Sequence, residues 1–251
     1  MLRTFFAVNG RLCDAIERHL PQAGDDVHSL YVARATECLR ARPGLVAADV
    51  GGGRKCDYAT DHDSSSGSRI IAVDVSPGEL SLNRDVDARL LGDASRSLPF
   101  AAGALDMITA CRLLEHLPDP GPFVSECRRV LRPGGFLILF LPARFAPFAL
   151  LKQMLPGRLM TRVIRFIYYP ESEQFCWSPL YYRACYPSAL ERLLRRHGFA
   201  LQEMQVSYYQ SRHFRACVLF YALSALYELM VYALRLRNLA SYVTVVATRT
   251  G

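Results

Sequence analysis

The sequence lacks the cysteine spacings that mark a disulfide framework or a zinc site. Its eight cysteines are scattered along the chain, and no two of them form a Cys-x-x-Cys pair. Closely spaced cysteine pairs are the usual ligands of structural zinc, and regularly spaced sets are typical of small secreted proteins. We therefore expect reduced thiols in a cytoplasmic protein, and no bound metal ion.

The first residues also lack the pattern of an export signal. Residues 1–10 contain only a short apolar core and no small-residue cleavage pattern. Acidic residues are scarce later in the chain, and residues 143–170 contain none. Residues 1–142 carry 16 basic and 18 acidic side chains, whereas residues 143–251 carry 14 basic and 5 acidic ones. This basic second half favours an anionic or amphiphilic partner, or else forms a solvated basic face.

Apolar runs alternate with helical patterns through most of the chain. At 251 residues the chain is long enough for one α/β domain with a lid. Strands of a largely parallel sheet, covered on both faces by helices, are the expected result. The predicted strands are 45–50, 69–75, 88–91, 105–110, 136–141, 200–208 and 241–249, and residues 133–135 form a predicted turn. The predicted helices are 2–20, 28–42, one beginning in 54–60, one capped by Ser76, 121–131, 187–197 and 214–239.

The first predicted strand ends in an acid and three glycines. Asp49 is followed after one residue by Gly51, Gly52 and Gly53. A glycine turn between a strand and a helix lets a nucleoside-sized ligand approach bare backbone. A tight loop without a ligand is the alternative for the glycines alone.

Three more polar signals follow at the ends of the next strands. Asp74 ends the second apolar run and lies 25 residues after Asp49, near the offset of about 20 residues for a ribose-binding acid. Asp93 and Ala94 follow the third run, and residues 111–116 follow the fourth. Asp74 could instead cap the next helix, and Asp93 could be a turn aspartate. The ordered series favours a ligand site.

In this order, the residues resemble the class I S-adenosylmethionine-dependent methyltransferases, in the small-molecule type-11 group that includes quinone-biosynthesis enzymes. The resemblance covers about residues 44–142. It implies a Rossmann-like, doubly wound sheet of seven strands whose last strand is antiparallel, with N-terminal helices and a helical lid. The expected parts are an N-terminal helical cap (1–44), an S-adenosylmethionine-binding core (45–142), a substrate lid (143–187) and a C-terminal part of the same fold (188–251).

The resemblance also implies a cofactor site for S-adenosyl-L-methionine. Lys55 stands where the family has a third glycine. Asp74 with Val75 matches the ribose-binding position, Asp93 with Ala94 matches the adenine-contacting position, and the Glu115-His116-Leu117 triplet is a recurrent signature of the loop after strand four. The implied cofactor-binding residues are Asp49, Gly51, Gly52, Gly53, Asp74, Val75, Asp93, Ala94, Cys111 and Arg112.

Neighbouring chemistries lack their motifs. A nicotinamide dehydrogenase would have Gly-x-Gly-x-x-Gly, whose third glycine position here is Cys56. The Asn/Asp-Pro-Pro-aromatic motif of amino-directed nucleic-acid methyltransferases does not occur after the fourth strand, and the chain has no Pro-Cys dipeptide for cytosine-C5 chemistry. No Cys-x₃-Cys-x₂-Cys motif for radical chemistry occurs.

If the acceptor is a hydroxyl, a base must take its proton. His116 is the first candidate and Glu115 the second, because both lie on a loop at the carboxyl edge of the predicted sheet, where ligands of such folds bind. The alternative is that His116 caps or packs the following helix. The other five histidines have no comparable sequence context.

The second half supplies the candidates for acceptor and partner. Residues 143–170 interleave basic and apolar side chains, as in a lid or in a surface that meets anionic lipid. Residues 216–234 contain one charged side chain, Glu228, and approach transmembrane length. If the strands on either side of this helix pair in one sheet, both helix ends lie on one side, so we expect a packed or interfacial helix.

We therefore expect methyl transfer to a small or amphiphilic acceptor, such as a lipid-linked, quinone-like or envelope-glycan molecule. The expected location is the cytoplasm, at the inner face of the membrane if the basic half binds lipid. A non-catalytic S-adenosylmethionine-binding or scaffolding protein is the alternative. An RNA-modifying methyltransferase is the third hypothesis, and it rests only on the basic half because no nucleic-acid motif occurs.

Overall fold

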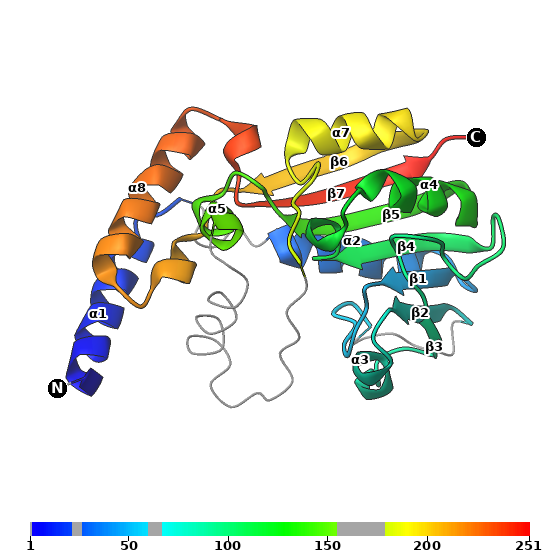
Figure 1. The fold of residues 1–251 in the computed structure, drawn as a ribbon, viewed down its shortest axis with the longest axis horizontal. Helices are drawn as coiled ribbons and strands as arrows, with labels where there is room; N and C mark the ends of the chain where they lie inside the picture. Colours follow the sequence, from blue (N-terminus) through cyan, green and yellow to red (C-terminus); the bar gives the residue numbers. More distant parts are fainter. Residues whose placement is uncertain (1, 22–26, 60–66, 155–178) are drawn as a thin grey trace.

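The computed structural model describes residues 2–21, 27–59, 67–154 and 179–251. Seven strands form one sheet in the order β3-β2-β1-β4-β5-β7-β6 (Figure 1). The strands are β1 (Val46–Val50), β2 (Arg69–Asp74), β3 (Ala88–Leu91), β4 (Leu105–Cys111), β5 (Leu131–Pro142), β6 (Phe199–Ser207) and β7 (Tyr242–Arg249). The helices are α1 (Leu2–Glu17), α2 (Val27–Ala41), α3 (Pro77–Leu82), α4 (Pro120–Val130), α5 (Pro147–Met154), α7 (Pro187–Arg196) and α8 (Val218–Ala233), with short 3₁₀ turns η2 (Leu114–His116), η3 (Ser211–Phe214) and η4 (Arg237–Leu239).

The sheet is parallel apart from β7. β1 pairs in parallel with β2 and β4 at the centre of the order, and β7 pairs antiparallel with both β5 and β6. A parallel strand covered on both faces reads as a continuous apolar run. β4 comes close to this description, because Leu105 to Ala110 are all buried and all of them except Asp106 and Thr109 are apolar. The predicted α/β fold with seven strands and an antiparallel last strand is confirmed.

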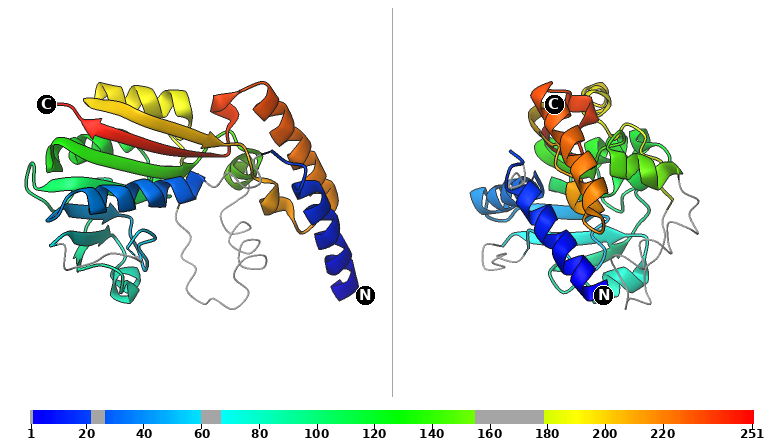
Figure 2. Two further views of the ribbon diagram at one scale, coloured as in Figure 1. Left: turned by 180° about the vertical axis from the view of Figure 1, so that it is seen from behind. Right: turned by 90° about the vertical axis from the view of Figure 1, so that its left-hand side faces the viewer.

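Helices cover both faces of the sheet. α2 lies against β5, β6 and β7 on one face, while α4 and α7 pack together on the other (Figures 1 and 2). α4 begins where the sequence provides a cap and a proline, since the Asp119 carboxylate accepts the Gly121 N–H at 2.9 Å and Pro120 opens the helix. α3 begins in the same way at Ser76 and Pro77, as the sequence predicts. The carboxyl ends of the parallel strands lie together at one edge of the sheet.

Two helices lie beyond that edge. α1 packs along α8, at the end of the molecule opposite the C-terminus (Figures 1 and 2). Arg215, which lies between η3 and α8, forms ion pairs with Asp14 and Glu17 of α1, the latter at 2.6 Å. The Asn9 side chain accepts the Val218 N–H at 2.6 Å, at the first residue of α8. α1 is therefore attached to α8 rather than to a face of the sheet.

The predicted helix that begins within 54–60 is wrong for residues 54–59, which form turns. The Lys55 N–H donates to the Gly52 carbonyl at 3.3 Å, and the Cys56 N–H donates to the Asp85 carboxylate at 3.0 Å. In an α-helix, these two backbone N–H groups would bond carbonyls of the preceding turn. Here one bonds within a turn, and the other bonds a side chain that lies 29 residues away.

The predicted helix over 214–239 is also too long. The structure divides it into η3, α8 and η4. α8 ends because Arg235 adopts a φ of 53°, and the Leu236 N–H then bonds the Val231 carbonyl while the Arg235 N–H bonds that of Tyr232. These are the two hydrogen bonds of a Schellman motif, which usually has glycine at its left-handed position. Because arginine occupies this position instead of glycine, the sequence pattern did not indicate the end of the helix.

The turn predicted at 133–135 lies inside β5. The pairing between β4 and β5 jumps from Leu105–Leu131 to Met107–Phe136, so the intervening residues form an irregularity within one strand. Gly134 has a φ of 76°, which glycine adopts without strain.

Two expectations concern the second half of the chain. Among the helices that the structure describes, none combines the length and apolar content that a bilayer crossing needs. Of the predicted lid (143–187), the structure describes residues 143–154, which include α5, and residues 179–187; three of its basic residues, Arg158, Arg162 and Arg165, lie outside the described residues.

Gly135→Ala is expected to destabilise the protein. An added Cβ would lie 2.9 Å from the Arg132 carbonyl oxygen and 3.0 Å from that of Asp106, both of them backbone atoms. We expect a loss of about 1–3 kcal/mol in the free energy of unfolding by urea. Gly10→Ala is the matched control, because Gly10 lies in α1 with nothing within 4 Å of an added Cβ. The control should gain about 0.5–1 kcal/mol. Equal effects of the two substitutions would contradict the close contact at Gly135.

Candidate functional site

The glycine turn leaves β1 at the carboxyl edge of the sheet. The Gly51 N–H donates to the Val73 carbonyl at 2.7 Å, and Gly51 has a φ of 76°. A Cβ on Gly51 would lie 3.2 Å from the Leu113 side chain, and one on Gly52 would lie 2.8 Å from the Asp49 carboxylate. Side chains at these two positions would therefore fill the turn, and glycine keeps it open.

Asp74 fastens that turn to the end of β2. One of its carboxylate oxygens accepts the Gly53 N–H at 3.1 Å, and the other accepts the Ser76 N–H at 2.9 Å. A carboxylate has about four acceptor positions, so about two remain for a ligand. Val75 follows directly and is 62% exposed. The structure thus places the predicted Asp74–Val75 pair beside the predicted glycine turn.

Asn83 also binds the glycine turn, and its role could not be predicted from the sequence. Its side-chain amide donates to the carbonyls of Gly52 and Gly53, each at 3.1 Å, and the residue is fully buried. Asn83 ends α3, some 30 residues after the turn. Such a long-range amide contact leaves no local signal in the sequence.

Asp49 lies beneath the turn. Its side chain is buried, and one carboxylate oxygen accepts the Thr109 hydroxyl of β4 at 2.8 Å. Tyr58 bonds the same hydroxyl oxygen at 2.8 Å. Burial raises the pKa of Asp49 to about 7, against the opposing effect of the Thr109 hydrogen bond. The carboxyl group is therefore part of a buried polar network under the glycines.

Asp93 and Ala94 continue the edge past Asp74. The Gly92 N–H donates to the Asp74 carbonyl at 3.0 Å, which brings the third strand end beside the second. One oxygen of Asp93 accepts the Ser95 N–H at 2.9 Å and its hydroxyl at 2.6 Å, and these hydrogen bonds lower the pKa of the carboxyl group. The other oxygen lies 3.3 Å from Arg96. Ala94 is buried.

A second group that sequence reasoning missed is the ion pair between His28 and Asp57. His28 Nε2 lies 2.9 Å from an Asp57 carboxylate oxygen, and the imidazole packs edge-on against Phe140 at the end of β5. The Asp57 hydrogen bond raises the pKa of His28 to about 9, and the same bond lowers that of Asp57 to about 2. His28 is therefore a cation at neutral pH, held at the carboxyl edge.

Cys111 adjoins that pair at the end of β4. The donor atoms of His28, Asp57 and Cys111 lie within 4.8 Å of one another. Three such donors can hold a metal ion only when the imidazole is neutral, because a protonated ring has no free lone pair. The ion pair with Asp57 favours the protonated ring and so competes with metal binding at these three groups. Lys55, which replaces the third glycine of the motif, lies 3.4 Å from the other Asp57 oxygen.

The loop after β4 carries the two candidate bases. Arg112 has a φ of 55°, and its N–H bonds the Phe140 carbonyl at 2.7 Å. Glu115 is buried, and burial raises the pKa of its carboxyl group to about 7. The backbone carbonyl of Glu115 accepts the N–H groups of Tyr181 and Tyr182 at 2.7 and 3.2 Å. Glu115 thus contacts the end of the predicted lid.

His116 contacts that segment through its ring. Its Nδ1 lies 3.0 Å from the Pro179 carbonyl oxygen, which can only accept, so Nδ1 carries the proton and Nε2 keeps a lone pair. Burial lowers the pKa of His116. Leu113, three residues earlier, packs against Gly51. The loop therefore joins the glycine turn to the base candidates.

Comparisons with known proteins found a family match and similar sequences. Residues 48–139 match the model of the methyltransferase domain family. A 37.1 kDa protein in transposon TN4556 of Streptomyces fradiae is 35% identical over 127 residues, or 48% of this chain and 36% of that protein. An uncharacterized methyltransferase of Mycobacterium avium is 33% identical over 109 residues, or 42% of each chain. The ubiquinone biosynthesis O-methyltransferase of Xanthomonas campestris is 30% identical over 160 residues, or 58% of this chain and 63% of that enzyme.

Two solved structures share the fold. The [4+2]-cyclase SpnF superposes with a TM-score of 0.55 at 18% identity, covering 91% of this chain and 82% of that one. A geranyl diphosphate methyltransferase in complex with geranyl diphosphate and sinefungin superposes with a TM-score of 0.55 at 15% identity, covering 88% and 78%. The sequence matches named above span 36% to 63% of the lengths of those relatives.

The fold and the match over residues 48–139 resemble those of class I S-adenosyl-L-methionine-dependent methyltransferases. The match to the methyltransferase domain family covers residues 48–139, which include the glycine turn, Asp74 and the loop after β4. The residues present fit the cofactor of this class, because an added Cβ would fill the turn at Gly51 or Gly52 and Asp74 keeps acceptor positions free.

Asp74→Ala is expected to weaken the binding of S-adenosylhomocysteine about 10- to 100-fold, measured by calorimetry. The substitution removes the acceptor of the Gly53 N–H and the free positions beside it, and charged hydrogen bonds contribute about 1.5–3 kcal/mol. Asp87→Ala is the matched control, because Asp87 accepts the Ile70 N–H at 2.7 Å at the other end of β2. The control should keep its affinity. Equal losses in both variants would contradict the assignment.

Proposed function

We propose that the protein transfers a methyl group from S-adenosyl-L-methionine to a hydroxyl group of a small amphiphilic acceptor. The observation that carries this proposal is the open turn at Gly51–Gly53, fastened to Asp74 at the carboxyl edge of the sheet. Ligands of open α/β sheets bind at this edge. When bound, the cofactor supplies the methyl group and its own sulfonium leaving group, so the protein mainly positions the acceptor.

In this proposal, residues at the ends of different strands bind different parts of the cofactor. The free acceptor positions of Asp74 take the two ribose hydroxyls. The Asp93 oxygen that faces Arg96 takes the exocyclic amine of adenine. The exposed Val75 offers an apolar surface to the base. Asn83 binds the carbonyls of Gly52 and Gly53 and so fixes the conformation of the glycine turn beside the ligand.

His28 takes the carboxylate of the methionine part. It is a cation held by Asp57 beside Cys111, at the edge where β1 and β4 end. A cation at this edge attracts the negative charge of a carboxylate. Asp57 serves as the positioning residue, because its carboxylate fixes the imidazole and keeps it protonated.

His28→Gln is expected to weaken the binding of one ligand of the cofactor site and to leave the binding of another unchanged. Glutamine keeps a hydrogen-bond donor but removes the positive charge. Binding of S-adenosylhomocysteine should weaken about tenfold, which is about 1.4 kcal/mol. Binding of 5′-methylthioadenosine, which lacks the amino acid carboxylate, should stay unchanged. Equal weakening of both ligands would show that His28 only supports the fold of the site.

His116 takes the proton of the acceptor hydroxyl. The Pro179 carbonyl fixes its tautomer and leaves Nε2 with a lone pair, while burial keeps the ring neutral at pH 7. A general base needs to be within hydrogen-bond reach of the proton and mostly unprotonated at the working pH. Glu115 is the weaker candidate, because burial raises its pKa to about 7 and leaves it largely protonated below that pH.

An amphiphilic acceptor is supported by the first described helix after β5. α5 exposes Leu150, Leu151 and Met154, which is 81% exposed, next to the half-buried Lys152. An apolar surface with a cation beside it suits a molecule with an apolar tail and a polar head. The names of one relative and one fold neighbour, for ubiquinone biosynthesis and geranyl diphosphate, point to molecules of this kind.

His116→Ala is expected to lower methyl transfer on the order of 10²- to 10⁴-fold without changing cofactor affinity. The assay uses tritiated S-adenosylmethionine and a cell extract separated into lipid, glycan, RNA and protein fractions, and label should enter the lipid fraction. Because burial lowers the pKa of His116, the wild-type rate should fall only at pH values below about 6.5.

His197→Ala is the matched control. Its Nδ1 bonds the Leu193 carbonyl at 2.9 Å, the same type of contact, at the end of α7. The control should retain full activity. Unchanged turnover in the His116 variant would refute its role as base, and label only in RNA would favour the nucleic-acid hypothesis. Cofactor binding with no labelled product in any fraction would favour the non-catalytic alternative.

A further inference from the structure

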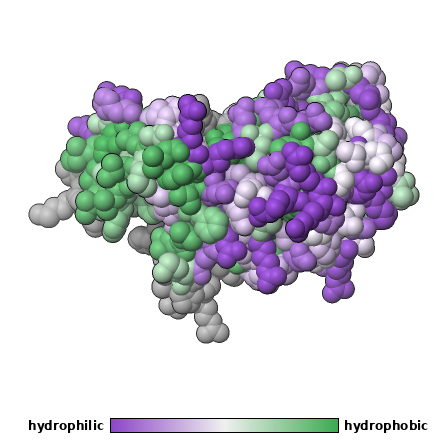
Figure 3. All heavy atoms as spheres, turned by 90° about the horizontal axis from the view of Figure 1, so that it is seen from above, coloured by the Kyte–Doolittle hydropathy of each residue, from purple (hydrophilic) through white to green (hydrophobic). Residues whose placement is uncertain are grey.

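α8 has the polarity of its faces reversed relative to a helix that faces water. Its side toward the protein includes Ser224 and Glu228, both buried. Its outward face consists of apolar side chains that are each between 49% and 65% exposed: Leu219, Phe220, Leu223, Leu226, Met230 and Leu234. At 3.6 residues per turn these six positions span an arc of roughly 120°. Figure 3 shows apolar residues gathered at the end of the molecule where Figure 1 places α8.

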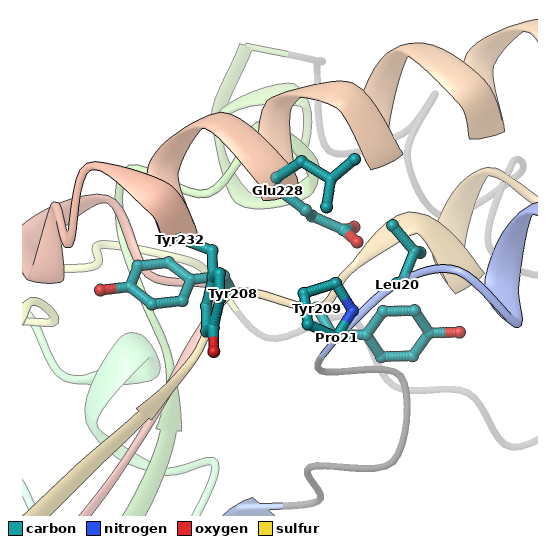
Figure 4. A pocket seen from close by; sticks show the side chains of 7 residues that line it. Leu20, Pro21, Tyr208, Tyr209, Glu228 and Tyr232 are labelled. Carbon is teal, nitrogen blue, oxygen red and sulfur yellow. The ribbon is translucent and has the colours of Figure 1, made fainter.

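The inward direction of Glu228 is structural. Its carboxylate accepts the Gln210 N–H at 2.8 Å and also the Ser211 N–H, so it caps the turn that follows β6. Figure 4 shows Glu228 beside Leu20 and Tyr209, among the residues that line a small pocket under α8. The single charge of residues 216–234 is therefore removed from the outward face.

An outward face of this kind requires an apolar partner. Contiguous exposed apolar patches on soluble proteins mark protein or membrane contacts. The outward face of α8 is followed directly by Arg235 and Arg237, both exposed and without an ion-pair partner among the described residues. The acids on the adjoining α1, Asp14 and Glu17, are paired with Arg215.

The charge next to the outward face thus favours an anionic partner. Residues 143–251 carry 14 basic and 5 acidic side chains. A second copy of the chain would bring the same basic groups toward one another across a two-fold contact, because such a contact uses the same patch twice. Anionic lipid headgroups neutralise these groups and offer apolar chains below them.

The position of α8 fits a helix that lies flat on a bilayer. α8 leaves the sheet after Ser207 of β6 and returns to Tyr242 of β7, and these two residues pair with each other. Both ends of α8 therefore lie on one side of any surface that it meets. Its 16 residues extend about 24 Å, less than the thickness of about 30 Å of a hydrocarbon core.

We propose that the outward face of α8, with Arg235 and Arg237, docks the protein on the surface of an anionic phospholipid bilayer. Tyr242 also pairs with Pro142 at the end of β5. The chain therefore leaves the sheet toward α8 and returns to it at the carboxyl edge. Docking therefore brings the edge that carries the glycine turn toward the lipid. This binding is independent of methyl transfer and can fail or succeed separately from the proposed function.

Vesicle sedimentation of the full chain tests the docking surface. The wild type should sediment with vesicles of phosphatidylcholine mixed with phosphatidylglycerol, and more weakly with pure phosphatidylcholine. Replacing two outward residues in the double variant L223E/L226E should lower binding on the order of tenfold or more. Arg237→Glu should lower binding to the anionic vesicles roughly fivefold, and added salt should reduce the difference.

Leu82→Glu is the matched control, because Leu82 is 48% exposed at the end of α3, away from α8. The control should bind vesicles as the wild type does, and circular dichroism should show that each variant is folded. Equal sedimentation of L223E/L226E and the wild type would overturn the proposal. A wild-type dimer in light scattering that L223E/L226E converts to a monomer, without vesicle binding, would assign the face to a second copy instead.

Discussion

One hydrogen bond, from the Gly53 N–H to the Asp74 carboxylate, joins the ends of two adjacent parallel strands. The strands reach the same level because β1 and β2 pair in register up to Val50 and Val73. The turn cannot accept side chains at its first two glycines without meeting Leu113 or Asp49. Bare backbone, a partly free carboxylate and the loop after β4 are consequently held within one edge. The rest of the candidate site is arranged around this junction.

The charged groups at that edge have different protonation states because their surroundings differ. Direct contact with Asp57 keeps His28 cationic, whereas burial lowers the pKa of His116 and favours its neutral form. The two histidines can therefore perform different tasks at the same pH, one opposite an anion and the other as a base. In α8, the surroundings also decide the role of a charged group, because its one acidic side chain points inward and caps a backbone turn. That inward turn leaves an apolar helix face at the end of the molecule where the carboxyl edge lies.

The sequence was most informative where a structural rule is local. Apolar runs located the strands, the cap at Ser76 located α3, and the glycines after Asp49 located the turn. It was least informative where a contact joins distant residues. Asn83 reaches the glycine turn across about 30 residues, and His28 meets Asp57 across 29, so neither has a local pattern. The two helix errors differ in origin. The Asp85 carboxylate accepts the Cys56 N–H from a distant part of the chain, whereas Arg235 ends α8 locally at a position where glycine is usual.

The central claim is that the carboxyl edge around Gly51–Gly53 and Asp74 is the nucleoside-binding site. Amide hydrogen exchange with and without S-adenosylhomocysteine tests it most directly, because it reports on each segment of the folded chain. The account predicts slower exchange in peptides that cover residues 49–58, 74–83 and 111–116 when the ligand is present. Exchange at residues 101–106, at the opposite edge of the sheet, should not change. Protection confined to other segments, or no protection at saturating ligand, would contradict the account.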